Sequence, residues 1–269
     1  MVVNLRRLRP VPGLFAAALL TISTVPLTVA SPAAVAKPCA DVEVVFARGS
    51  DEPPGVGKVG QAFVDALRSD LTDRSMAVYP VNYAAASGFS SGLDFDRSVI
   101  AGIRDEVSHI EWTALDCPDT QIVLGGYSQG AAVTGYATAQ SVPTGLPDEL
   151  VPDLPRPMPD VAADHVAAVI LFGKPSTTFI RRYDAPPVTI GPLYAAKTRE
   201  FCAQNDTVCN GGDGIPFGHL DYPTNGMAAT AAKFAAGRIA ADSTQGVTLH
   251  GWHTSDSMRG VRQPNPETP

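Results

Sequence analysis

Two serines in this chain stand in the pattern Gly-x-Ser-x-Gly, namely Ser128 and Ser90. In a strand-to-helix turn of this pattern, the serine hydroxyl is lifted above the carboxyl end of a sheet, and small residues are needed two positions before and after it. Ser128 follows the short apolar run 122–124, which predicts the leading strand. Ser90 follows alanines and a serine that are typical of a loop. We therefore expect Ser128 to be a nucleophile and Ser90 to be a loop residue.

A serine hydroxyl is a poor nucleophile unless a base takes its proton and an acid orients that base. His250 and His253 lie in a polar C-terminal segment, His165 begins an apolar run, and His109 lies on the flank of a helical pattern. His219 lies in a loop rich in Gly and Asp just before the last helical pattern, where it could reach the serine. His219 is therefore the predicted base.

The acid is expected between the serine and the histidine, because α/β-hydrolases place these residues in the chain order Ser, Asp or Glu, His. Asp206 lies there, in an eight-residue segment bounded by Cys202 and Cys209. A disulfide between these cysteines would hold the carboxylate in place. The rival acids, for which a solvated turn is the simpler interpretation, are Asp184, Asp213 and Asp221.

The chain contains four cysteines, an even number that suggests two disulfides in an exported protein. Because Cys202 and Cys209 are close in sequence, a short bridge between them is favoured, and Cys39 is left to pair with Cys117. A zinc site is the alternative, but the cysteines lack paired C-x-x-C spacing. We expect neither a metal nor an organic cofactor.

Apolar runs alternate with helical patterns along the chain, which predicts an α/β fold with a parallel sheet and helices on both faces. The ligand site of such a sheet forms at the carboxyl ends of its strands. The expected strands are 42–47, 76–81, the run 122–124, 166–172 and 198–201, and the expected helices are 59–71, 99–114, 129–139 and 227–239.

The chain divides into a leader, one domain and a tail. Residues 1–36 combine three arginines, a short apolar core and a small-residue cleavage site, which is typical of a secretory signal peptide. Cleavage after Ala36 is our choice, and cleavage after Ala30 is the alternative. The domain is expected at 37–242, with an insertion at 142–159 whose six prolines should prevent regular structure. Residues 243–269 are expected to be a loose polar tail.

Removing residues 1–36 leaves 233 residues and takes the net charge from −7 to −10, because the leader carries three basic and no acidic residues. An acidic exported domain argues against nucleic acid or an anionic membrane as the main partner. No other segment is long and apolar enough to span a bilayer. We expect a soluble monomer that is secreted, either extracellular or associated with the cell wall.

Three separate segments carry a resemblance to the cutinase family, closest to the secreted esterases of mycobacteria and related actinobacteria. The segment 118–130, ending in GGYSQG, and CAQNDTVCNGGDGIPFGH at 202–219 resemble the family's two signature regions. FARGSDE at 46–52 resembles its oxyanion loop. The resemblance implies a small α/β-hydrolase with a five-stranded parallel sheet, two disulfides and no large lid.

The resemblance also implies roles for single residues. Ser128 would be the nucleophile, Asp206 the acid and His219 the base, and the backbone N–H groups of Ser50 and Gln129 would form the oxyanion hole. The insertion at 142–159 and the tail after residue 243 have no counterpart in the compact family pattern, and either could change which substrates enter.

The expected activity is hydrolysis of carboxylic esters with short to medium acyl chains, through an acyl-serine intermediate. Ile215, Phe217 and Leu220 flank the predicted base and could line an apolar acyl crevice, or simply pack on the core. A lipase or phospholipase and an acetyl-polysaccharide esterase of the same fold remain alternatives. A secreted binding protein or antigen without turnover is the alternative of another class.

Overall fold

Five parallel strands form the centre of the domain. In a computed structural model, which describes residues 39–88 and 92–250, they form one sheet in the order β2-β1-β3-β4-β5. The central strands are nearly continuous apolar runs because both faces of the sheet are covered. The predicted five-stranded parallel sheet is confirmed. The strands are β1 (Val42–Ala47), β2 (Met76–Pro80), β3 (Gln121–Tyr127), β4 (Val166–Phe172) and β5 (Thr198–Phe201).

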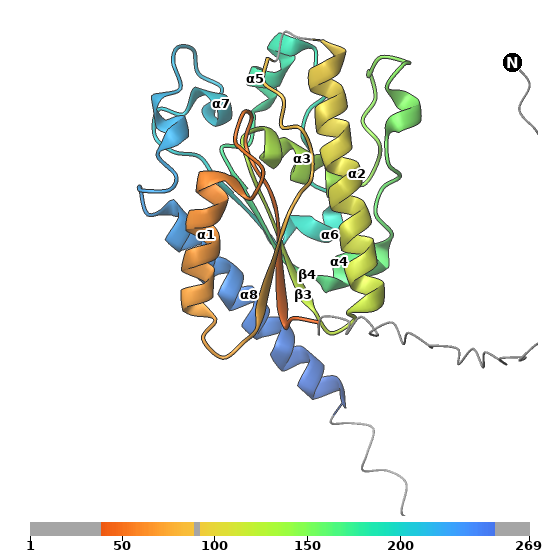
Figure 1. Ribbon diagram of the computed structural model, residues 1–269, viewed down its shortest axis with the longest axis vertical. Helices are drawn as coiled ribbons and strands as arrows, with labels where there is room; N and C mark the ends of the chain where they lie inside the picture. Colours follow the sequence, from red (N-terminus) through yellow and green to blue (C-terminus); the bar gives the residue numbers. More distant parts are fainter. Residues whose placement is uncertain (1–38, 89–91, 251–269) are drawn as a thin grey trace, which may run out of the picture. The chain divides into compact units, whose positions relative to one another are not determined.

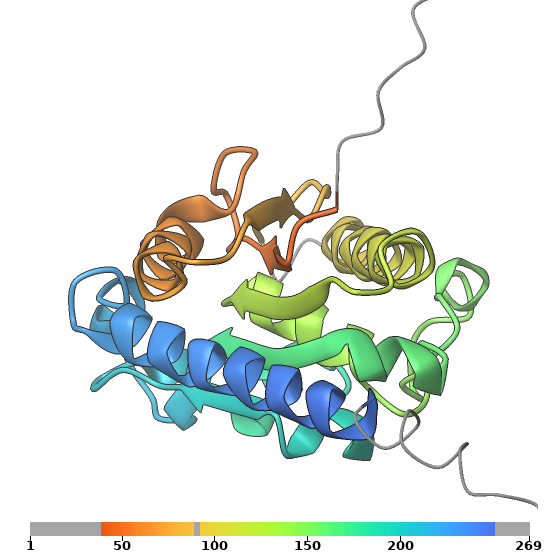
Figure 2. The same ribbon diagram turned by 90° about the horizontal axis from the view of Figure 1, so that it is seen from below.

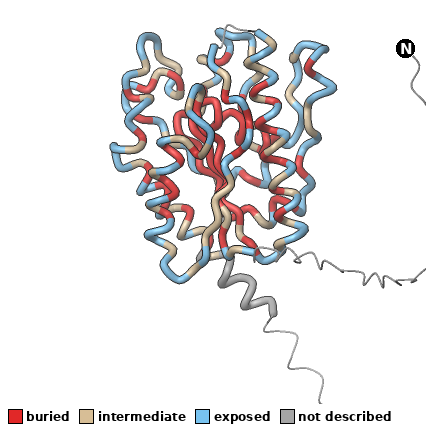
Figure 3. The backbone as a smooth tube through the Cα atoms, viewed as in Figure 1, coloured by how far each residue is buried: buried red, intermediate tan, exposed pale blue. Residues whose placement is uncertain are grey.

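Long helices cover the two faces of this sheet (Figures 1 and 2). Helices α1 (Gly57–Asp70) and α8 (Met227–His250) pack on one face, where Phe63 and Ile239 join one buried apolar cluster. Helices α2 (Leu93–Asp116) and α3 (Gln129–Ala137) pack on the other face. The buried residues accordingly concentrate on the strands and on the inner helix faces, as Figure 3 shows.

Short helical segments connect the main elements and were not predicted. Each has three to six residues, too few to show a helical period in the sequence. They are α4 (Asp160–His165), α5 (Thr177–Ile180), α6 (Pro192–Ala195), α7 (Thr207–Asn210) and the 3₁₀ turns η1 (Val151–Asp153), η2 (Arg181–Tyr183) and η3 (Phe217–Leu220).

The proline-rich segment 142–159 is mostly irregular, as expected, but η1 is a turn of 3₁₀ helix within it. Leu150, just before this turn, is fully buried, and Met158 is also buried. Asp153 forms an ion pair of 3.7 Å with Arg104 of α2. The segment is therefore attached to the domain by apolar anchors, and a complete absence of regular structure was the wrong expectation.

The last helix is longer than predicted. Helix α8 continues to His250, so the first eight residues of the expected loose tail are helical. Residues 243–250 contain no proline, and the backbone hydrogen bonds of the helix can continue through them despite their polar composition. The rest of the expected tail and the expected signal peptide at 1–36 lie outside the described residues.

Two disulfides join the cysteines in the predicted pairs. Cys39 pairs with Cys117, with 5.6 Å between their Cα atoms, and ties the start of β1 to the end of α2. Cys202 pairs with Cys209, with 5.7 Å between their Cα atoms, in the loop that follows β5. Within residues 39–88 and 92–250, no helix has the length and apolar character that a membrane crossing requires.

Candidate active site

Ser128 lies in a sharp turn between β3 and α3. Its φ of 54° and ψ of −116° are unusual for a residue with a side chain, and its N–H donates a hydrogen bond to the carbonyl of Phe172. Such a backbone costs about 1–3 kcal/mol and persists only where surrounding contacts hold it. A Cβ atom at Gly126 would collide with the carbonyl of Gly130, and one at Gly130 with the carbonyl of Ala47. The small-residue requirement of the motif is therefore met by close backbone contacts.

His219 connects the serine to an aspartate. Its Nε2 lies 2.8 Å from Oγ of Ser128, and its Nδ1 lies 2.9 Å from Oδ2 of Asp206. A carboxylate only accepts hydrogen bonds, so Nδ1 carries the proton and Nε2 of the neutral ring is free to accept the proton of the serine hydroxyl. The structure thus brings together the three residues that the sequence analysis selected.

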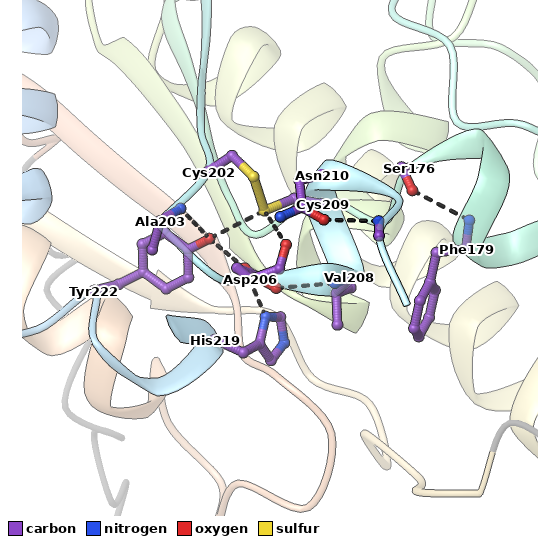
Figure 4. Close-up of a disulfide and its surroundings, with 11 residues drawn as sticks. Ser176, Phe179, Cys202, Ala203, Asp206, Val208, Cys209, Asn210, His219 and Tyr222 are labelled. Atoms are coloured by element: carbon purple, nitrogen blue, oxygen red, sulfur yellow. Dashed lines mark hydrogen bonds and ion pairs between the residues drawn. A yellow bond between two sulfur atoms is a disulfide. The ribbon is translucent and has the colours of Figure 1, made fainter. Parts of the chain in front are cut away.

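Asp206 is fully buried and held on both carboxylate oxygens (Figure 4). Oδ1 accepts a hydrogen bond of 3.0 Å from the N–H of Val208, which makes Asp206 the N-cap of α7. Oδ2 faces His219. The disulfide between Cys202 and Cys209 closes the loop around it. The three rival aspartates, Asp184, Asp213 and Asp221, are exposed.

The surroundings of Asp206 favour its charged form. Burial by itself raises the pKa of this carboxyl, but the hydrogen bonds from His219 and Tyr222 outweigh burial and hold the pKa below its usual value. An ionised Asp206 can stabilise the positive charge that His219 acquires when it takes a proton.

Two tyrosines that the sequence analysis did not select hold this pair in place. The hydroxyl of Tyr222, which is fully buried, donates a hydrogen bond of 2.5 Å to Oδ2 of Asp206. The hydroxyl of Tyr127 donates one of 2.7 Å to the carbonyl of His219, and the two rings lie 5.0 Å apart. The only sequence signal for them was their position, next to the serine and three residues after the histidine.

Two glycines leave room for the imidazole. At Gly218, a Cβ atom would collide with the carbonyl of Gln204, so only glycine lets the histidine loop approach the aspartate loop this closely. Gly173, at the carboxyl end of β4, has a φ of 56°, and a Cβ there would lie 2.9 Å from Cε1 of His219. Larger residues at either position would displace His219.

The loop after β1 carries Ser50. Arg48 is buried and donates hydrogen bonds of 2.8 and 2.6 Å to the carbonyls of Glu52 and Tyr83. The carboxylate of Glu52 accepts hydrogen bonds of 2.8 Å from the N–H groups of Gly49 and Lys58. These contacts fix the loop, and Oγ of Ser50 is buried in it without a hydrogen-bond partner among the described residues.

Gln129, the second residue expected at the oxyanion hole, is the first residue of α3 and is 1% exposed. Because α3 begins there, its backbone N–H belongs to the first turn of the helix, where N–H groups have no partner in the preceding turn. The partial positive charge of a helix N-terminus therefore lies beside the serine.

The other histidines considered as the base, and the second serine considered as the nucleophile, are not part of this group of contacts. His109 contacts Glu43 at 3.1 Å between Nε2 and Oε2, and His165 is the last residue of α4. His250 ends α8, whereas His253 and Ser90 lie outside the described residues.

Ile215, Phe217 and Leu220 are 68%, 74% and 77% exposed, so the simpler expectation that they pack on the core is wrong. All three lie within four residues of His219 in the sequence. None of them lines the apolar cavity between α2 and α3 that Gln129 lines. Their role in an acyl crevice stays a prediction.

The fold and this constellation define the class of protein: an α/β-hydrolase whose candidate nucleophile is a serine on a strand-to-helix turn. The model of the cutinase family matches residues 38–239. The chain belongs to the cutinase family, whose members hydrolyse carboxylic esters.

Relatives and solved structures agree with this assignment. The chain is 49% identical to a probable carboxylesterase, Culp5 of Mycobacterium tuberculosis, over 68% of this chain and 98% of that protein. It is 42% identical to the phospholipase Culp4 of the same organism, over 75% of this chain and 80% of that protein. A Trichoderma reesei cutinase, solved with a phosphonate inhibitor, is similar with a TM-score of 0.55 and 32% identity, over 75% of this chain and 78% of that one.

Proposed function

We propose that this chain is a secreted serine esterase in which Ser128, His219 and Asp206 act as nucleophile, base and acid. The contact of 2.8 Å between His219 Nε2 and Ser128 Oγ carries the proposal, because it places the base where it can take the hydroxyl proton. Ser128 attacks the ester carbonyl while its proton moves to Nε2. His219 then gives this proton to the leaving alcohol.

The second half of the reaction releases the acid. His219 takes a proton from a water molecule that attacks the acyl-serine carbonyl, and returns it to Oγ of Ser128 as the acyl–oxygen bond breaks. Asp206 keeps its negative charge throughout and holds the Nδ1 proton of the imidazole.

The negative charge that develops on the carbonyl oxygen requires hydrogen-bond donors. We assign this role to the backbone N–H groups of Ser50 and Gln129. The unpartnered hydroxyl of Ser50 can add a third donor. Removal of one such donor costs about 3–4 kcal/mol of transition-state stabilisation in a well-studied serine protease.

The substrate class that fits best is a carboxylic ester with a short to medium acyl chain. The exposed residues Ile215, Phe217 and Leu220 are one apolar surface that such an ester could contact. The match to Culp4, which is named a phospholipase, supports a lipid ester as the second candidate. An acetyl-polysaccharide esterase is a third candidate, in which only the acetyl group would enter the site.

Export of the chain is part of the proposal. The two disulfides suit an oxidising compartment, and the N-terminal sequence is typical of a signal peptide. A binding protein without turnover would not need the aligned contacts from Ser128 to Asp206.

Hydrolysis of p-nitrophenyl butyrate tests the proposal. We expect the purified mature chain to release p-nitrophenolate, and Ser128→Ala to lower kcat/KM by at least three orders of magnitude while its circular dichroism is unchanged. Ser90→Ala, in the second Gly-x-Ser-x-Gly segment, is the matched control and should retain full activity. Hydrolysis that survives in the Ser128→Ala variant would refute the assignment.

A further inference from the structure

An apolar cavity of about 140 Å³ is lined in part by Gln129, the residue that follows Ser128 in the chain. Its walls come from α2, from α3, from the segment 142–157 and from the end of α5 with the residues that follow it. Figures 1 and 2 show the proline-rich segment alongside α2. Ser128, Asp206 and His219 do not line this space.

The cavity follows one face of α3. Gln129, Ala132 and Tyr136 line it at positions i, i+3 and i+7, and Ala139 lines it just beyond the helix. At 1.5 Å per residue, the seven steps from Gln129 to Tyr136 correspond to about 10 Å along the helix. The cavity therefore extends along α3 from the residue that follows the nucleophile in the chain.

The facing wall is a stripe of α2. Val99, Ile103 and Val107 line the cavity at positions i, i+4 and i+8, on a single face of that helix. Only Asp96 and Arg156 among the lining residues carry a charge. For comparison, an engineered apolar cavity of about 150 Å³ stays free of water and binds benzene. A hydrocarbon chain is the ligand that suits such walls.

The end of the cavity at Gln129 is polar. Nε2 of Gln129 donates a hydrogen bond of 3.0 Å to the carbonyl of Ala86, which fixes the orientation of the side-chain amide. Its Oε1 is buried and has no hydrogen-bond partner among the described residues. A buried acceptor of this kind is costly unless a ligand or water donates to it. An ester has no hydrogen-bond donor, so a water molecule is the group that can donate to this oxygen. The carbonyl end of the ester, rather than its apolar chain, therefore suits the space at Gln129, next to Ser128.

The proline-rich segment is the outer wall. Val142, Leu146 and Leu154 face the cavity from it, while Leu150 and Met158 anchor the segment in the core. Its six prolines restrict the backbone. The wall is therefore in place before a ligand binds.

We propose that this cavity binds the aliphatic acyl chain of the ester and that the proline-rich segment limits the length of that chain. This inference rests on the proposed function, because the ester carbonyl must lie at Ser128. The competing position for the chain is at the exposed residues Ile215, Phe217 and Leu220, which do not line the cavity.

Chain-length profiles of matched variants test the proposal. Leu154→Trp and Val99→Phe narrow the cavity from opposite walls. We expect each to lower the ratio of kcat/KM for p-nitrophenyl dodecanoate to kcat/KM for the acetate at least tenfold. The controls are Val151→Trp, three residues from Leu154 in the same segment, and Val161→Phe in α4, because neither position lines the cavity. Unchanged profiles in both narrowing variants would overturn the proposal.

A crystal structure of the wild-type chain with a dodecyl phosphonate on Ser128 tests the same point without any substitution. We expect the alkyl chain between α2 and α3, with Leu154 in contact. An alkyl chain lying over Phe217 would overturn the cavity assignment and leave the proposed esterase intact. If no phosphonate attached to Ser128, the proposed function would fail first, and this inference with it.

Discussion

The hydroxyl of Tyr222 and the imidazole of His219 share one oxygen atom, Oδ2 of Asp206, at 2.5 and 2.9 Å. The tyrosine therefore takes part of the negative charge that would otherwise interact only with the histidine. Tyr222 also accepts a hydrogen bond of 3.0 Å from the N–H of Ala203, so it ties the aspartate loop to the histidine loop. We regard Tyr222 as a positioning residue, because it acts on the reaction through Asp206.

Tyr222→Phe should move the pH dependence of activity. The hydrogen bond from Tyr222 helps to hold the pKa of Asp206 low, so without it this carboxylate becomes protonated at a higher pH. We expect the acid limb of the kcat/KM profile for p-nitrophenyl butyrate to shift upward by about half a pH unit. If Tyr222 had only a structural role, the variant would be less active at all pH values and the acid limb of its kcat/KM profile would not shift. That result would contradict this account.

The two disulfides should have different effects when removed. Cys202→Ser with Cys209→Ser loosens the loop that holds Asp206, so kcat should fall at least tenfold. Cys39→Ser with Cys117→Ser opens a loop of sequence separation 78 far from the site and should cost about 4–5 kcal/mol of unfolding free energy with kcat retained at low temperature. Urea denaturation and initial rates on both double variants check this contrast. Equal losses of kcat in the two variants would contradict it.

The buried carboxyl of Glu106 should make the domain less stable at alkaline pH. Glu106 is fully buried between α2 and α3, and burial raises its pKa to about 8. Thr134 Oγ1 lies 3.2 Å from Glu106 Oε2 and 3.1 Å from the carbonyl of Gly125, and one hydroxyl proton can serve only one of them. A protonated Glu106 that donates to Thr134 satisfies both contacts.

The raised pKa of Glu106 determines how the free energy of unfolding changes with pH. The folded state binds this proton up to about pH 8, whereas the unfolded chain releases it near pH 4.3, so the stabilisation is complete below the lower value and is lost as pH rises toward the higher one. Glu106→Gln should remove this loss, which amounts to a few kcal/mol between pH 5 and pH 9. Urea denaturation of both proteins at these pH values is the measurement. Parallel pH dependences for wild type and variant would show that Glu106 is ionised in the fold.

The main strands and the residues Ser128, Asp206 and His219 could be predicted because the sequence patterns that indicate them are local. Apolar runs mark β1, β3 and β4, and the order of serine, aspartate and histidine, together with the disulfide loop, selects Asp206. The contributions of Tyr222 and Tyr127 could not be predicted, since each depends on a hydrogen bond between segments distant in the sequence. The cavity wall formed by residues 142–157 could not be predicted either, because prolines indicate a loop without indicating where it packs.

The central claim is that Ser128 forms the covalent intermediate. The most direct test is intact-mass and peptide mass spectrometry after reaction with a p-nitrophenyl alkylphosphonate. We predict one phosphonyl group per chain, located on Ser128, with labelling abolished in Ser128→Ala and retained in Ser90→Ala. A label on any other residue, or labelling of Ser128→Ala to the same extent as the wild type, would contradict the account.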